Sequence, residues 1–172
     1  MKMEKAYLIN NTHSDYLGLK WVLKAIKKDD TRYMLNRLSI DKTDAVCTDG
    51  HRLHDYYLKE TFEAGLYKPF CVKNEIILIQ SNDGEYPKWK QLFLETSAEK
   101  SIKIYPNKNL KLLNTSYAKL IRLMDEDEGL DLSYWNDILS FGTEYEVRWY
   151  GDKKQIIFIN QTHRAMIMPM RV

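Results

Sequence analysis

The sequence has few cysteines, prolines and glycines, and it has no long apolar run. Of its 172 residues, 2 are Cys, 4 are Pro and 7 are Gly. Two cysteines are too few for a disulfide framework, and because Cys47 and Cys71 both lie in apolar, strand-like runs, we expect buried, reduced thiols. No run approaches the roughly 20 apolar residues that span a bilayer. Met1–Lys5 is not followed by an apolar segment of signal-peptide length. We therefore expect a cytoplasmic protein with no membrane partner.

The sequence also lacks a strong charge imbalance and the common catalytic motifs. The formal net charge is +2, which is too small to indicate nucleic-acid binding unless basic residues gather locally. There is no Gly-rich phosphate loop, nucleophile elbow or His-Glu-x-x-His motif. The run of neighbouring carboxylates at Asp125–Glu128 is more typical of a solvated loop than of a catalytic pair. We therefore expect a non-enzymatic protein without a cofactor.

What is present is a globular chain that is long enough for a hydrophobic core. In its first part, a strand at Ala6–Asn10 is followed by a helix at about Asp15–Lys28. The apolar stripe of that helix recurs at positions i, i+3, i+4 and i+7 and consists of Leu19, Val22, Leu23 and Ile26. Strands are predicted next at Tyr33–Ile40, Asp44–Thr48 and His51–Leu58. Asp49-Gly50 predicts a type I′ hairpin between the last two.

The remainder of the chain predicts further strands and two helices. After a connection at Lys59–Lys68, the predicted strands are Pro69–Lys73, Glu75–Gln80, Ser101–Tyr105, Leu110–Leu113, Glu144–Tyr150, Gln155–Asn160 and His163–Met170. The predicted helices are Thr115–Met124 and Leu132–Phe141. Both ends of the chain therefore share a βαβββ plan. This pattern indicates an α+β fold with antiparallel sheets and helices on one side.

Two short segments carry the strongest functional signal. They are Thr48-Asp49-Gly50-His51-Arg52-Leu53 and, at the other end, Met168-Pro169-Met170-Arg171. Together with Leu19–Ile26, Asp30–Asn36, Asp83–Pro87 and Asp131–Leu139, they make the chain resemble the bacterial DNA polymerase sliding clamp, the β subunit of the replicative polymerase.

The resemblance covers the chain unevenly. Residues 1–94 resemble the start of the clamp's middle domain, residues 95–130 have no convincing counterpart, and residues 131–172 resemble the end of its last domain. A standard clamp subunit has three domains, whereas this chain has room for one clamp-like domain at residues 1–172. The resemblance implies the DNA-clamp (processivity factor) fold, which is built from βαβββ half-units.

The resemblance also implies a pocket for an extended peptide that carries a glutamine and large apolar side chains. Methionines adapt to varied apolar anchors, and arginines can fix backbone carbonyls or carboxylates. The residues carried over are Arg32, Leu35, Thr48, Gly50, His51, Arg52, Leu53, Tyr134, Met166, Met168, Pro169, Met170 and Arg171. Taken singly, these segments are more typical of a hairpin turn, a core strand and a solvated terminus; taken jointly, they favour the pocket. The sequence leaves open whether its two halves meet within one chain or between chains.

A basic stripe on the first predicted helix suggests a second interface. Lys20, Lys24, Lys27 and Lys28 recur at i, i+4, i+7 and i+8 and would share one helix face. Such a face suits the sequence-independent, salt-sensitive attraction of double-stranded DNA. An ordinary solvated helix face explains the pattern equally well.

Three functional hypotheses follow from these features. The first is a processivity or tethering factor that binds DNA polymerase or other clamp-motif proteins, with a homo-oligomeric ring on DNA. The second is a peptide-binding adaptor or decoy that does not encircle DNA. The third is an enzyme that uses a metal near Cys47, Asp49, His51 and His54, but strand alternation places the two histidines on opposite faces, so we expect no metal.

One further segment loosely resembles the clamp-binding peptide itself. Gln91-Leu92-Phe93-Leu94 combines a glutamine with large apolar side chains. It could dock in the chain's own pocket or in that of a neighbour, but a buried edge strand or helix is the preferred interpretation.

Overall fold

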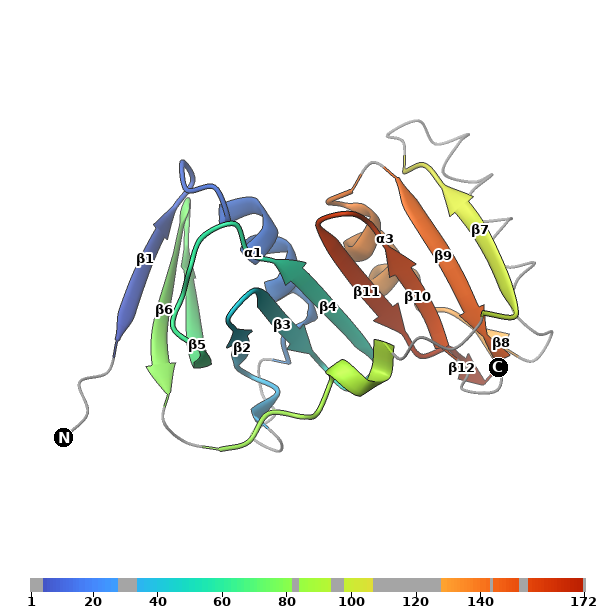
Figure 1. Ribbon diagram of the computed structural model, residues 1–172, viewed down its shortest axis with the longest axis horizontal. Helices are drawn as coiled ribbons and strands as arrows, with labels where there is room; N and C mark the ends of the chain where they lie inside the picture. Colours follow the sequence, from blue (N-terminus) through green and yellow to red (C-terminus); the bar gives the residue numbers. More distant parts are fainter. Residues whose placement is uncertain are drawn as a thin grey trace. The chain divides into compact units, whose positions relative to one another are not determined.

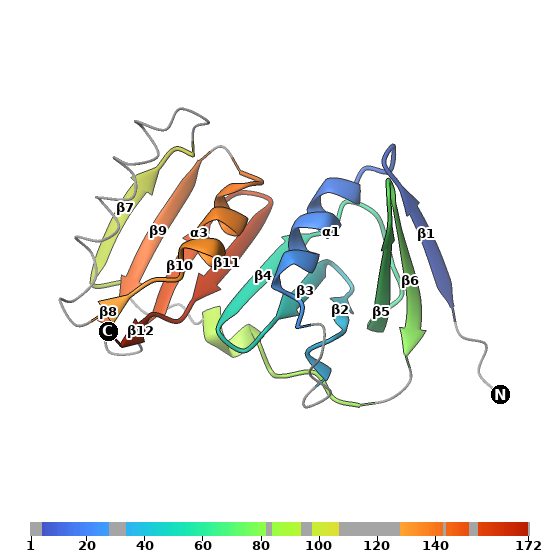
Figure 2. The same ribbon diagram turned by 180° about the vertical axis from the view of Figure 1, so that it is seen from behind.

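The fold is that of a computed structural model of the chain, which forms two compact units. The first unit is Met1–Lys88 and the second is Trp89–Val172 (Figures 1 and 2). The structure describes residues 5–27, 34–81, 84–93, 98–106, 128–142, 144–151 and 155–171. None of the helices in these segments is long and apolar enough to cross a membrane.

The first unit is a six-stranded antiparallel sheet covered on one face by a helix. Its elements are β1 (Ala6–Asn10), α1 (Tyr16–Val22), the 3₁₀ turn η1 (Leu23–Ala25), β2 (Leu38–Asp41), β3 (Asp44–Thr48), β4 (Arg52–Tyr57), β5 (Gly65–Val72) and β6 (Glu75–Ser81). The strand order is β1-β6-β5-β2-β3-β4. The predicted βαβββ plan is therefore confirmed here, with the β5–β6 hairpin inserted between β1 and β2.

Packing of α1 on this sheet follows the predicted apolar stripe. Leu19 and Val22 are fully buried, and α1 contacts β3, β4 and β6. The helix approaches β4 very closely at Gly18, because a Cβ at this position would lie 2.2 Å from Cζ of Tyr56. Only glycine lets the helix backbone rest on that buried ring.

The second unit has a four-stranded antiparallel sheet with the order β11-β10-β9-β7. Its elements are η3 (Lys90–Phe93), β7 (Lys100–Ile104), β8 (Glu128–Gly129), α3 (Leu132–Leu139), β9 (Tyr145–Tyr150), β10 (Gln155–Ile159), β11 (His163–Ile167) and β12 (Met170–Arg171). The helix α3 covers one face of the sheet (Figure 2). The Trp135 ring of this helix meets the Phe158 ring edge-on, with 5.5 Å between the ring centroids. The sequence β7, α3, β9, β10, β11 repeats the βαβββ order, which confirms the predicted fold class.

Several predicted boundaries are wrong for local reasons. The α-helix ends at Val22 rather than Lys28, because the chain passes into the 3₁₀ turn Leu23–Ala25. The 3₁₀ turn itself ends because Ile26 has an extended backbone. The strand predicted from Tyr33 begins at Leu38, since Met34 has a φ of +54° and the N–H of Arg37 donates to its carbonyl. The strand predicted from Pro69 begins at Gly65 and lies partly in the expected connection.

The end of the chain and one cysteine also differ from prediction. The last long strand ends at Ile167, and Met170–Arg171 pair separately with Glu128–Gly129 as a two-stranded ladder. Pro169, which has no N–H to donate, lies between the two strands. Cys47 is buried as expected, but Cys71 is exposed, so that prediction is wrong. The strand predicted at Leu110–Leu113 and the helix predicted at Thr115–Met124 lie outside the described residues.

Candidate functional site

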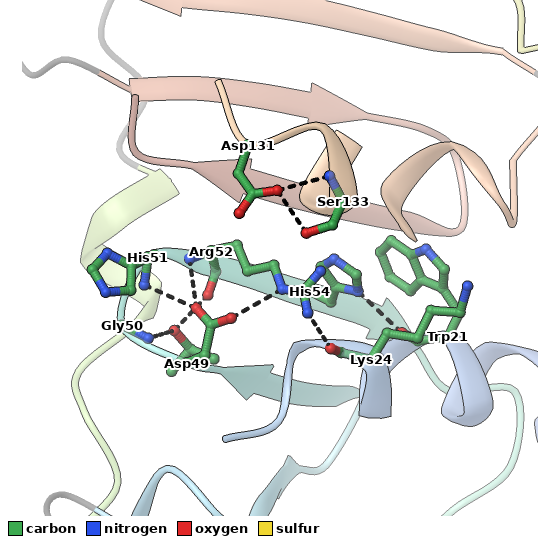
Figure 3. A network of polar contacts seen from close by, with 10 residues as sticks. Trp21, Lys24, Asp49, Gly50, His51, Arg52, His54, Asp131 and Ser133 are labelled. Carbon is green, nitrogen blue, oxygen red and sulfur yellow. Dashed lines mark hydrogen bonds and ion pairs between the residues drawn. The ribbon is translucent and has the colours of Figure 1, made fainter. Parts of the chain in front are cut away.

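The first group of predicted site residues forms the turn between β3 and β4. This turn, Thr48–Leu53, is held by side chains within it (Figure 3). The Asp49 Oδ1 accepts the backbone N–H groups of His51, at 2.9 Å, and Arg52, at 3.0 Å. The Thr48 hydroxyl donates to the Arg52 carbonyl at 2.6 Å and accepts the N–H of Gly50 at 3.1 Å. The turn is therefore preorganised by its own polar groups.

The predicted type I′ geometry is wrong, although the hairpin itself is present. Gly50 has a φ of +92°, whereas Asp49 and His51 do not have a positive φ. A type I′ turn needs a positive φ at both central residues, whereas a type II′ turn needs it only at the first, which is usually Gly. The N–H of Asp49 donates to the Arg52 carbonyl at 3.4 Å, so Gly50 and His51 are the central pair. This arrangement is the II′ combination.

Arg52 is bound within the first unit. Its Nε lies 3.1 Å from the Asp49 carboxylate, and Nη2 donates to the Lys24 carbonyl at the end of η1. The residue is only 8% exposed. The predicted role of fixing a carboxylate and a carbonyl is thus carried out on the chain's own groups, and Arg52 joins the turn to the end of the helical segment.

The other predicted residues of this group divide between surface and core. His51 is exposed, and its ring points away from the polar network in Figure 3. Leu53 is 1% exposed and belongs to the core. Leu35 lies beneath the turn, because its Cδ1 is 3.9 Å from the position of a Cβ on Gly50. Arg32 lies outside the described residues.

The second group of predicted residues lies in the second unit. Met166 is buried in β11, whereas Tyr134, Met168 and Pro169 are half-buried. For Met170 and Arg171 the structure describes the backbone, which pairs with β8. Near this group, the Asp131 carboxylate caps α3 by accepting the N–H of Ser133 at 2.8 Å (Figure 3).

The sequence matches no protein-family model and no curated protein, but the fold has solved counterparts. A protein of Eubacterium rectale, described as a DNA polymerase III β subunit, matches with a TM-score of 0.67 and 12% identity. The sliding clamp of Bacillus subtilis matches with a TM-score of 0.62 and 14% identity. The β clamp of Helicobacter pylori, solved with a DNA ligase peptide, matches with a TM-score of 0.63 and 11% identity. Each match covers 100% of this chain.

This chain has the fold of the bacterial sliding clamp. It spans about two thirds of the length of the clamps it matches, namely 67%, 66% and 67% of these three chains. The fold predicted from the two short motifs is therefore confirmed. At identities of 12%, 14% and 11%, the likeness establishes the fold.

Within this clamp fold, the predicted lysine stripe is altered by the short helix. Lys20 lies on α1 and is exposed, Lys24 lies on η1 and is exposed, and Lys27 follows the helical segment. Lys28 lies outside the described residues. Of the three described lysines, Lys27 lies beyond the helical segment, so these lysines do not share one helix face as predicted. Lys20 and Lys24 keep the exposure that a phosphate contact needs.

The residues considered for a metal do not come together. His54 is fully buried, stacks on Trp21 at 4.3 Å between ring centroids, and places Nδ1 3.0 Å from the Trp21 carbonyl (Figure 3). His51 is exposed in the turn. Among the described residues, the one group with metal-ligand spacing is instead His13, Asp15 and Glu60.

The His13 group is arranged by hydrogen bonds rather than by ligand geometry. The N–H of Asp15 donates to His13 Nδ1 at 3.1 Å, so the proton of a neutral ring lies on Nε2, which is 3.2 Å from Glu60. That nitrogen therefore has no lone pair for a metal. The Asp15 carboxylate already accepts three hydrogen bonds, from Tyr56, Lys59 and Glu60.

Sequence reasoning missed the residues that hold the turn in place. The sequence presents Asp49 as half of a hairpin signal and as a candidate metal ligand, yet its carboxylate binds three donors in the turn. Asp at the first position of a turn often accepts backbone N–H groups two residues on, which is a signal that could have found it. The role of the Lys24 carbonyl had no sequence signal, because a backbone group 28 residues from Arg52 is identified only by folding.

Proposed function

We propose that this chain is a clamp-like tethering factor of DNA replication that binds clamp-motif peptides of DNA polymerase or other partners. The observation that carries the proposal is the match of the whole chain to the clamp fold, including a clamp solved with a DNA ligase peptide. The proposal assigns no catalytic step to the chain.

We assign peptide binding to the two groups of predicted residues. In the first unit, the preorganised turn presents Gly50 and His51 at the surface above Leu35. In the second unit, Met168, Pro169 and Tyr134 are half-buried, which suits adaptable contacts with apolar side chains. Arg52 is a positioning residue in this proposal, since its guanidinium binds Asp49 and Lys24.

A direct test is fluorescence anisotropy with a labelled Gln-Leu-Ala-Leu-Phe peptide. We expect binding in the micromolar range and a loss of about tenfold in affinity for Met168→Ala, because an apolar contact near 1.4 kcal/mol is removed. Leu8→Ala is the matched control, since Leu8 is an apolar side chain that is 63% exposed on β1. Absence of binding at about 500 μM, equivalent to a free energy weaker than about −4.5 kcal/mol, would reject the peptide site.

A second measurement separates the tethering factor from an adaptor or decoy without a ring. Light scattering and retention on circular, but not linearised, DNA would support a homo-oligomeric ring. A strict monomer that still binds the peptide would support the adaptor. For DNA contact, the double variant Lys20→Gln, Lys24→Gln should lower the slope of log affinity against log salt concentration. The expected change corresponds to the loss of about two phosphate contacts.

A further inference from the structure

A groove in the first unit is separate from the residues assigned to the clamp-motif peptide. It has a volume of about 500 Å³, within the usual size range of ligand pockets. Its walls are Leu23 and Ile26 from the end of the helical segment, Asn36 and Arg37 before β2, and Lys68–Val72 of β5. We call it the β5 groove.

The groove exists because β5 is longer than its neighbour β2. The pairing of the two strands ends at Leu38–Tyr67, while β5 continues to Val72 and pairs with β6 alone. Pro69 lies in this overhang, where a residue without an N–H is tolerated at a sheet edge. The space that another strand would fill is therefore open in the part of the chain that the structure describes.

The groove combines exposed apolar surface with positive charge. Phe70 is 39% exposed and Val72 is 52% exposed, and their spacing of two residues on β5 places these large apolar side chains together on one face. The charged side chains that line the groove within the described segments are Arg37 and Lys68, and both are basic. The Nε of Arg37 is buried and has no hydrogen-bond partner among the residues that the structure describes, although Nη1 donates to Asn36 Oδ1 at 2.9 Å. A buried donor without an acceptor costs free energy until a ligand supplies one.

We propose that the β5 groove binds an extended segment of a partner protein in which a carboxylate lies beside a large apolar side chain. The carboxylate accepts from Arg37 and is attracted by Lys68, while the apolar side chain packs against Phe70 and Ile26. Charge complementarity selects an acidic segment, and the open strand edge suits an extended chain. The inference does not depend on the proposed clamp-motif site.

Cys71 supplies a local reporter for this groove. It is exposed and lines the groove, whereas Cys47 is fully buried and its pKa is raised by that burial. The chain has no other cysteine. A disulfide reagent such as dithionitrobenzoate should therefore react first at Cys71, and a bound segment should slow this reaction.

The experiment uses the full chain and two labelled peptides, Glu-Val-Leu-Phe-Glu and its neutral counterpart Ser-Val-Leu-Phe-Ser. We expect the acidic peptide to bind about tenfold more tightly in anisotropy, as charge-assisted hydrogen bonds allow. We also expect it to slow modification of Cys71 at least about fivefold at saturation. Arg37→Gln and Lys68→Gln should each weaken binding, whereas the matched control Lys100→Gln, which exchanges an exposed strand lysine in the second unit, should not.

Four outcomes would overturn the inference. They are equal binding of the neutral peptide, no protection of Cys71 at about 1 mM acidic peptide, loss of binding in Met168→Ala, and protection that rises with protein concentration alone. The third would move the peptide to the clamp-motif site, and the fourth would make a second copy of the chain the occupant. Lys68 is exposed, so Lys68→Gln keeps the test valid if Arg37→Gln fails to fold.

Discussion

The two units both hold their helix with the hydroxyl of a buried tyrosine, but the acceptors differ. In the first unit, Tyr56 on β4 donates to the Asp15 carboxylate, just before α1, at 3.0 Å. In the second unit, Tyr145 on β9 donates to the backbone carbonyl of Ile138, near the end of α3, at 2.8 Å. Burial raises the pKa of both phenols, so both remain donors.

A glycine lies against each of these tyrosines. A Cβ on Gly18 would fall 2.2 Å from the Tyr56 ring, and one on Gly142 would fall 2.7 Å from the Tyr145 ring. Both units therefore place a residue without a side chain where the anchoring ring lies. Similar packing with different acceptors means that the units should respond differently to loss of charge and to pH.

The surroundings of each tyrosine explain this difference. Asp15 is fully buried and is a hub of three donors, the Tyr56 hydroxyl and the N–H groups of Lys59 and Glu60. Tyr145 instead receives the N–H of Gly142, at 3.0 Å, and faces His163 Nε2 at 2.7 Å. The first unit depends on one anion, whereas the second depends on one neutral imidazole.

Removing the anion should have the largest effect. Asp15→Ala leaves three donors without their acceptor, and we expect the free energy of unfolding to fall by about 4 kcal/mol. Amide hydrogen exchange should rise in α1 and β4 and stay nearly constant in β9 and β10. Glu60→Ala is the matched control, because that carboxylate is exposed and should contribute less than about 0.5 kcal/mol. Equal losses of unfolding free energy in the two variants would contradict the role of Asp15 as the shared acceptor of three donors.

Acidification should act mainly on the second unit. Burial lowers the pKa of His163 to about 4, below the value of about 6.5 expected for the unfolded chain. Below pH 6.5 the unfolded chain therefore takes up a proton that the folded unit does not. The contribution of His163 to the free energy of unfolding should be constant above pH 6.5. It should decline by about 3 kcal/mol as the pH falls to about 4.

The measurement is the pH dependence of unfolding in the parent chain and in His163→Gln. Gln can still donate to Tyr145 but does not titrate, so the difference between the two slopes isolates this histidine from the carboxylates. Parallel curves between pH 6.5 and pH 4 would show that His163 does not control acid stability. Hydrogen exchange in β11 identifies the unit that opens.

The sequence predicts the bounds of an element correctly where a local pattern sets them, and wrongly where a contact with a distant residue sets them. The strands Ala6–Asn10 and Asp44–Thr48 have the predicted bounds, because apolar runs and flanking turn residues define them locally. The helix was predicted too long, since its apolar stripe continues to Ile26. Its end is fixed instead near Lys24, whose carbonyl accepts from Arg52. A contact over such a distance leaves no periodic signal.

The site shows the same limit. Asp49-Gly50 correctly predicts a hairpin. The turn type, however, depends on the Asp49 carboxylate, which accepts the N–H groups of His51 and Arg52 across the turn. The alternation of β5 places Cys71 on the same face as the buried Tyr67, yet Cys71 is exposed because β2 ends before reaching it. Strand length relative to a neighbour is a tertiary property, so composition and periodicity do not reveal it.

The smallest predicted effect concerns how each helix begins. The Asp131 carboxylate caps α3 through the N–H of Ser133, whereas the Asp15 carboxylate makes no capping bond to α1 because it binds Tyr56 and the chain after β4. Asp131→Ala should therefore lower the free energy of unfolding by about 1 kcal/mol, as loss of an N-cap usually does. The Asp131→Asn variant should recover most of that loss, since an amide oxygen still caps. Asp15→Asn should recover a smaller share, since its amide oxygen can accept from Tyr56 and Lys59 but its N–H₂ would then face the N–H of Glu60. Urea titration of the four variants compares the two roles. If both asparagines restore stability equally, the carboxylates of the two units act alike and the contrast between anion and cap fails.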